Sequence, residues 1–180
     1  MKNIIEFLRL ILIYIAIIII CPNLSYSSSE TSSNRITIEV PPYLFINSDQ
    51  RDLRLTFSDY KTGAESNTET VVYTVMGNNM TQSDGAPAVI ARLDGSFPAI
   101  DFKARVGAYL KQGGNMELGA ISSDFVSIGD SETPLARKAN SSGDGKLLRG
   151  QIEVSYKAVA TVPLTAGQYS QQLTLTLTDV

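Results

Sequence analysis

The chain contains no histidine and no tryptophan, and its one cysteine, Cys21, lies inside an N-terminal apolar run. Without histidine it cannot build a Ser-His-Asp or Cys-His nucleophile system. It also cannot supply the histidine or multiple cysteine ligands of a typical zinc site. These absences exclude several enzyme classes before any pattern is considered.

A basic surplus is also missing. The 180 residues carry 15 Lys and Arg against 18 Asp and Glu, a net charge of −3. Proteins that hold a phosphate backbone usually present clustered positive charge, so we expect no nucleic-acid partner. The apolar fraction of 43% is enough to form a core, and the length suits one domain with a leader.

The N-terminus has the three parts of a secretory signal peptide. Lys2 and Arg9 precede the uncharged run 10–21 (LILIYIAIIIIC), and Ser25 and Ser27 stand at −3 and −1 of a cleavage site. As a helix this run would be about 18 Å long, too short for a hydrocarbon core of about 30 Å. We therefore expect a cleaved signal peptide over residues 1–27 and an exported protein, located in the periplasm, at the cell surface or outside the cell. An uncleaved anchor that includes residues 4–8 is the alternative.

After residue 27 the chain has no cysteine and so forms no disulfide. Many exported domains of this size use a disulfide for stability, so core packing or assembly must replace it here. Residues 28–34 are serine-rich, and we expect a flexible polar tail there.

The rest of the chain alternates between apolar and polar residues, which is the period of a β-strand. The best strand is predicted over 148–162, where Ile152, Val154 and Tyr156 fall on one face. No sustained 3.6-residue period follows the leader. Seven to nine short strands separated by turn residues predict an all-β sandwich that forms one domain over residues 35–180.

Three local patterns give more specific expectations. Residues 71–76 (VVYTVM) lack clean alternation, which predicts a strand buried on both faces. Asp94-Gly95 is a hairpin-type turn between strands at 88–93 and 97–110. Residues 130–146 are polar and predict a surface loop, with at most one helical turn near Leu135.

No motif predicts chemistry. The oxygen-rich segment 140–145 lacks the acidic ladder of an EF-hand and suits a polar turn. Glycosylation sequons at Asn79 and Asn140 matter only in a eukaryotic secretory pathway. Carboxylates are plentiful but show no pairing pattern across a sugar site, so a carboxylate-based hydrolase ranks third among the possible functions. We expect no catalytic residue, no cofactor and no metal site.

The two ends of the exported chain both carry regular alternating strands, and this is its most informative feature. Ile36, Ile38 and Val40 alternate with polar residues and run into Pro41-Pro42. The last strand carries Leu173, Leu175 and Leu177 on one face and reaches almost to the C-terminus; the three form the candidate terminal-strand lining. An alternating strand of this kind pairs either within its own domain or with the sheet edge of another molecule. If it adds to a neighbour, the side chains at 36, 38 and 40 fill the neighbour's pockets.

These ends resemble a known family. Residues 35–46 (RITIEVPPYLFI) resemble the start of mature alpha-fimbrial major subunits, the class 5 pilins of chaperone–usher systems. Residues 55–58 followed by the strand at 71–76 have a similar order. The closing segment 163–170 (PLTAGQYS), followed by 173–178, is similar to the approach to the last strand of those pilins. It is also similar to the end of spore coat protein U-like domains, which are secreted and pilin-like.

The resemblance covers the ends of the chain and not residues 77–146, and protein U-like domains usually carry cysteines that are absent here. It implies an incomplete immunoglobulin-like sandwich completed by donor-strand exchange. It also implies self-association into polymers, a periplasmic chaperone and an outer-membrane usher. The leading prediction is therefore a structural subunit of a bacterial surface fibre or pilus-like polymer. The alternative is a self-complete, monomeric binding module with an immunoglobulin-like fold, secreted or periplasmic.

Overall fold

The structure is a computed structural model that describes residues 35, 37–50, 52–83, 85–140 and 144–179. Contacts divide the chain into Met1–Glu39 and a compact body, Val40–Val180. The expected signal peptide 1–27, the tail 28–34 and Ile36 lie outside the described residues. The described residues form nine strands and no α-helix, so the all-β prediction is confirmed.

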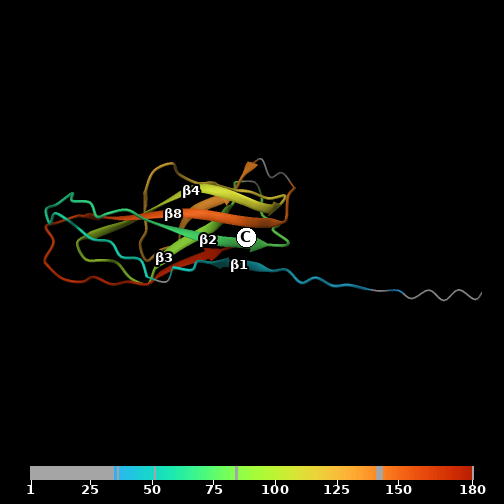
Figure 1. Cartoon of the computed structure of the whole chain (residues 1–180), viewed down its shortest axis with the longest axis horizontal. Helices are drawn as coiled ribbons and strands as arrows, with labels where there is room; N and C mark the ends of the chain where they lie inside the picture. Colours follow the sequence, from blue (N-terminus) through green and yellow to red (C-terminus); the bar gives the residue numbers. More distant parts are fainter. Residues whose placement is uncertain (1–34, 36, 51, 84, 141–143, 180) are drawn as a thin grey trace, which may run out of the picture. The chain divides into compact units, whose positions relative to one another are not determined.

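The strands form two antiparallel sheets, an arrangement compatible with a β-sandwich. The five-stranded sheet has the order β1 (Leu44–Asn47), β2 (Glu69–Gly77), β8 (Leu148–Ala160), β4 (Ile100–Gly114) and β6 (Val126–Ser127). The four-stranded sheet has the order β5 (Leu118–Ala120), β7 (Thr133–Lys138), β3 (Pro87–Leu93) and β9 (Leu173–Leu177). In Figure 1, β2, β8 and β4 run side by side, as their pairing registers require.

The core lies between the sheets, and both contribute to one buried apolar cluster. On β8 the side chains of Ile152, Val154 and Tyr156 are fully buried, on the face that the alternation predicts. The Tyr156 ring stacks on Phe102 of β4, with the ring centroids 5.7 Å apart. Its hydroxyl lies 2.9 Å from the Tyr73 hydroxyl, so the polar end of this buried ring has a partner.

The prediction that residues 71–76 are buried on both faces is wrong. Val71 and Val75 are buried in β2, but Val72 between them is 43% exposed. The five-stranded sheet packs its core on one face only, and β-branched residues also suit an open face.

The predicted hairpin at Asp94-Gly95 is also wrong. β3 pairs with β7 and β9, whereas β4 pairs with β8 and β6 in the other sheet. Asp94 is instead bound to the start of β9. Its backbone N–H donates to the Gln172 carbonyl (3.0 Å), and its carboxylate accepts from the Gln172 N–H (2.8 Å). The turn therefore carries the chain from one sheet to the other.

The segment 130–146 is not simply a surface loop, and Leu135 is not in a helical turn. Residues Thr133–Lys138 form β7, in which Leu135 and Ala136 are buried. Lys138 is also buried, with Nζ 3.2 Å from the Gln82 carbonyl to which it donates. The polar composition of this segment predicted a loop and not a buried strand, because a lysine such as Lys138 is usually a surface residue and its buried partner is not evident from the sequence.

Two segments with an alternating sequence, 35–40 and 52–57, form no strand among the residues that the structure describes. Arg35 and residues 37–40 have no strand, and Ile38 and Val40 are 82% and 72% exposed. Leu53 and Leu55 pack against the core and are half-buried, but only an isolated bridge from Phe57 to Ser66 pairs this segment. Pairing of Ile36, Ile38 and Val40 with another copy stays a prediction.

Candidate functional site

The terminal strands β1 and β9 present open edges next to each other. β1 pairs with β2 and β9 pairs with β3, and each is the last strand of its sheet within the described chain. The two strands are also in contact, although no ladder joins them among the described residues. Each strand therefore has a row of backbone N–H and C=O groups that face away from its own sheet, which is a template for another strand.

The opposite side of the body is closed by the chain itself. β4 and β5 are joined by residues 115–117, which pass from one sheet to the other. The N–H groups of Asn115 and Met116 both donate to the Leu147 carbonyl (2.9 and 3.0 Å). The Asn115 side chain accepts from the N–H groups of Lys146 and Leu147. The two sheets are thus joined by the chain itself on the β4–β5 side, whereas on the other side β1 and β9 are in contact without a connecting segment or a ladder among the described residues.

The predicted terminal-strand lining lies on the side of β1 and β9. Leu173 and Leu175 are half-buried against the core, Leu177 is buried, and the intervening threonines are exposed. Ile46 of β1 is likewise only half-buried against the core. We call the strip between β1 and β9 the seam. Its apolar side chains are partly covered, so another strand could bury them further.

An asparagine that sequence reasoning missed fixes the entry to β1. The Asn78 side chain accepts from the Tyr43 N–H (2.6 Å) and donates to the Pro41 carbonyl (2.8 Å). Its backbone N–H donates to the Tyr43 carbonyl (3.2 Å). The backbone just before β1 is therefore held in place. Asn78 belongs to no motif that indicates this role, so no sequence pattern could have found it.

Asp179 holds the chain after β9 at this same end of the seam. Its carboxylate accepts hydrogen bonds from the Thr81 N–H (2.6 Å), the Thr81 hydroxyl (3.0 Å) and the Gln82 N–H (2.9 Å). These bonds tie the chain after β9 to the loop between β2 and β3. A mostly apolar hollow of about 330 Å³ opens there, lined by Pro42, Tyr43, Leu44, Asn79 and Asp179. It is large enough for an apolar side chain.

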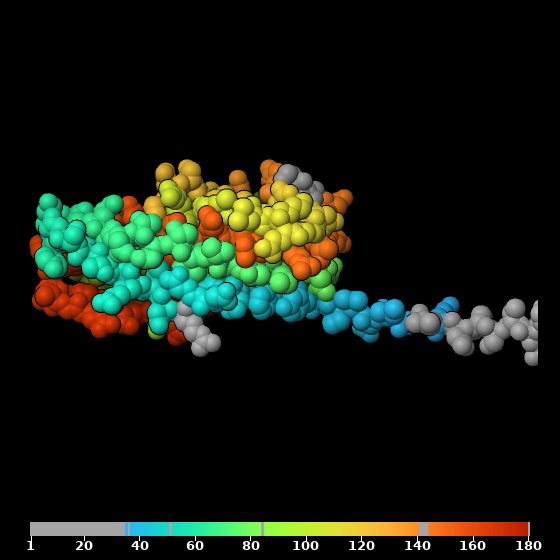
Figure 2. All heavy atoms as spheres, in the orientation of Figure 1, coloured from blue at the N-terminus to red at the C-terminus, as the bar shows by residue number. Residues whose placement is uncertain are grey.

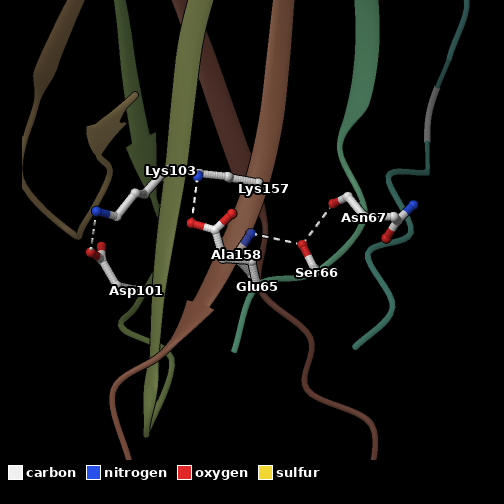
Figure 3. Close-up of polar contacts among 7 residues, drawn as sticks. All are labelled: Glu65, Ser66, Asn67, Asp101, Lys103, Lys157 and Ala158. Atoms are coloured by element: carbon white, nitrogen blue, oxygen red, sulfur yellow. Dashed lines mark hydrogen bonds and ion pairs between the residues drawn. The ribbon is translucent and has the colours of Figure 1, made fainter. Parts of the chain in front are cut away.

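Charges on the outer face of the five-stranded sheet are compensated locally. Lys103 and Lys157 lie directly opposite each other in the β4–β8 register, an unfavourable pair by itself. Lys103 binds Asp101 at 3.1 Å and Lys157 binds Glu65 at 2.7 Å, as Figure 3 shows. Each of these two facing lysines therefore has a carboxylate partner.

The buried tyrosines are structural groups. Burial raises the pKa of Tyr156 and of Tyr73 above the ordinary value of 10.0. Both hydroxyls are therefore neutral at physiological pH, and their mutual hydrogen bond leaves no activated oxygen.

No group of three or more metal-binding side chains gathers among the described residues. Within the same residues, no helix has the length and apolar character needed to cross a membrane. Comparison with protein-family models, with curated proteins and with solved structures gave no match.

Proposed function

We propose that this protein is a structural subunit of an exported, pilus-like surface fibre, assembled by β-strand addition. Its body would be an immunoglobulin-like sandwich that lacks one strand at the seam. In the fibre, the segment with Ile36, Ile38 and Val40 from one copy occupies the seam of another copy. The observation that carries this proposal is the pair of neighbouring open edges at β1 and β9, with half-buried apolar side chains along them.

The N-terminal segment has the complementary properties. Ile38 and Val40 are 82% and 72% exposed, and the described residues from 35 to 40 belong to no strand. Exposed aliphatic side chains in a strict two-residue period suit an open edge, because alternate side chains enter the partner while the backbone completes its ladder.

Pro41 and Pro42 argue against pairing of this segment with its own β1. A tight hairpin needs a type I′ or II′ turn, and these turns require positive φ angles. Proline fixes φ near −65°, so two prolines directly before Tyr43 cannot form such a turn. An edge in a second copy satisfies the segment without this reversal.

The energetic scale favours a long-lived complex. Full burial of an Ile or Val side chain contributes about 1.5–3 kcal/mol, and the segment offers three of them. A new backbone ladder adds to this and removes an open edge that invites aggregation. The exported chain has no cysteine after Cys21, so strand addition would provide the stability that disulfides give to other exported domains.

The same logic supports the accessory partners. A subunit with an open seam needs cover between export and assembly, because exposed edges associate nonspecifically. The resemblance of the two chain ends to class 5 pilins implies a periplasmic chaperone and an outer-membrane usher for this task. The signal-peptide pattern of residues 1–27 supports export.

The experiment that tests the function is gel migration of the protein, isolated from the cells that produce it, in SDS without heating and after boiling. We expect a ladder of multimers without heating that collapses to monomer on boiling, because strand-added chains dissociate slowly. A monomer band in both lanes, from folded protein free of chaperone, would refute the proposal and favour the self-complete binding module.

A variant pair then identifies the segment. Ile38→Asp places a charge on the apolar face, where an unpaired buried carboxylate costs several kcal/mol, so the unheated ladder should disappear. Thr37→Asp adds the same charge one residue away, on the other face of the strand, and should leave the ladder intact. Equal loss in both variants would contradict the assigned role of the alternating face.

A further inference from the structure

The body has two distinct ends, defined by strand register. Leu44, Gly77, Leu148 and Gly114 lie side by side at the end where β1 begins, which we call the entry end. Ile100 and Ala160 pair at the opposite end, which we call the far end. Figure 2 shows the residues near 60 and near 165 together at one end of the body, opposite to the residues near 77 and near 114.

The far end carries exposed apolar side chains. Tyr60 is 58% exposed, Val162 is 49% exposed and Tyr169 is 37% exposed. They belong to two adjoining loops, because the Leu164 N–H donates to the Tyr60 carbonyl at 2.8 Å. We call these three residues the far-end patch. Tyrosines with an exposed ring and a polar tip are typical of protein interfaces.

The loop that carries Tyr60 is held firmly on β8. The Gly63 N–H donates to the Ala160 carbonyl at 2.8 Å. Ser66 Oγ accepts from the Ala158 N–H at 2.9 Å, and Glu65 binds Lys157, as Figure 3 shows. The far-end patch is therefore a preorganised surface, which lowers the entropic cost of docking.

The entry end is apolar and fixed as well. Tyr43 is 50% exposed and Leu44 is 43% exposed, and both line the hollow with Pro42. Asn78 binds the backbone of Pro41 and Tyr43 on either side of Pro42. The direction in which the chain enters the body is thereby set.

Chain length brings these two ends together in the proposed fibre. β9 runs from the far end, where Leu173 pairs with Leu93, to the entry end, where Asp179 binds Thr81. β9 offers a longer open edge than β1, and antiparallel addition is the more stable kind. A strand added antiparallel to β9 therefore finishes with Val40 at the far end of the accepting copy. Only Pro41 and Pro42 separate Val40 from Tyr43 of the donating copy, and these three residue steps reach roughly 10 Å.

From this geometry we propose that the far-end patch docks the entry end of the next copy in the fibre. Tyr60, Val162 and Tyr169 of one copy would pack against Pro42, Tyr43 and Leu44 of the next. The contact joins two different surfaces, so it repeats without closing and gives a head-to-tail chain. This inference rests on the proposed strand addition and adds a second, body-to-body interface to it.

Engineered cysteines test this interface, because the chain after Cys21 has no cysteine of its own. The test variant carries Tyr43→Cys and Val162→Cys. The matched control carries Tyr43→Cys and Val72→Cys, because Val72 is similarly exposed (43%) but lies on the outer face of β2. Multimers from cells that produce the protein are treated with a short bis-maleimide and run on SDS gels, unheated and boiled. The single variants Tyr43→Cys, Val162→Cys and Val72→Cys measure any cross-linking that involves Cys21 of the leader.

We expect the test variant to gain a ladder of covalent multimers that survives boiling, while the control pair and the single variants collapse to monomer. The test variant could instead keep its unheated ladder but give no more boiling-resistant multimers than the control pair. That result would overturn the end-to-end contact, although strand addition would still hold. If the unmodified protein shows no ladder of multimers without heating, both the proposed strand addition and this inference are wrong.

Discussion

β8 and β9 show the same two-residue alternation in the sequence, but β8 is a central strand of its sheet and β9 is an edge strand. β8 is paired on both sides, to β2 and β4, and its inward side chains Ile152 and Val154 are fully buried. β9 is paired on one side, to β3, and its inward Leu173 and Leu175 are only half-buried. The difference teaches that alternation identifies a strand's inner face but not its place in the sheet. We propose that the central strand stabilises the body and that the edge strand serves assembly.

The largest effect on the body is expected for Ile152→Ala on β8. Truncation of a fully buried isoleucine removes apolar contacts and leaves a cavity, at a cost of about 2–5 kcal/mol. Chemical denaturation of the purified, unheated protein, compared between the variant and the unmodified chain, measures this loss. A cost below about 1 kcal/mol would mean that β8 is not the centre of the core.

An intermediate effect is expected from pH, through the hydroxyl pair that joins β8 to β2. Burial raises the pKa of Tyr156 and Tyr73 in the folded state, whereas unfolded tyrosine titrates near 10.0. The unfolded state therefore gains charge first, and stability present below pH 10 is lost as pH rises above it. For Tyr156 the loss is at most about 1.4 kcal/mol per pH unit.

Thermal melts between pH 8 and pH 12 measure this alkaline loss. The variant carrying both Tyr73→Phe and Tyr156→Phe removes the two titrating groups and is the control. Its melting temperature should fall less steeply than that of the unmodified protein over this range. An equal fall would mean that the hydroxyl pair does not control alkaline stability.

The smallest effect on the body is expected for Leu175→Ala on β9. Its side chain is half-buried, so truncation should cost about 1 kcal/mol in the monomer. An added strand would complete the burial of Leu175, and the same substitution should then lower the temperature at which the unheated ladder collapses.

Thr174→Ala is the matched control, because Thr174 is exposed on the same strand. Gel migration after stepwise heating compares the two variants. If Leu175→Ala and Thr174→Ala collapse at the same temperature, Leu175 does not line the site of addition.

Sequence reasoning succeeded where the evidence was local. The inward face of β8 follows from alternation at Ile152 and Val154, and the structure confirms it. Alternation is a property of neighbouring residues, so it survives without knowledge of partners. The same reasoning placed Leu173, Leu175 and Leu177 on one face of the last strand.

It failed where the answer depended on distant partners. The turn at Asp94 was recognised, but its bonds to Gln172 across 78 residues carry the chain into the other sheet. β7 was missed because Lys138 reads as a surface residue until the Gln82 carbonyl is placed beside it. Asn78 and Asp179 have no motif, and their roles depend on the loops that the fold brings to them.

By itself the sequence determined the all-β class and the inner faces of the main strands, because a two-residue period is set by the backbone of each strand alone. Only the tertiary structure decided that β1 and β9 end their sheets, that these two edge strands contact each other, and that β4 and β5 join the sheets on the opposite side. Those features depend on pairings between segments far apart in the chain. Period and composition do not encode such pairings, because every alternating strand offers the same two edges until its neighbours occupy them.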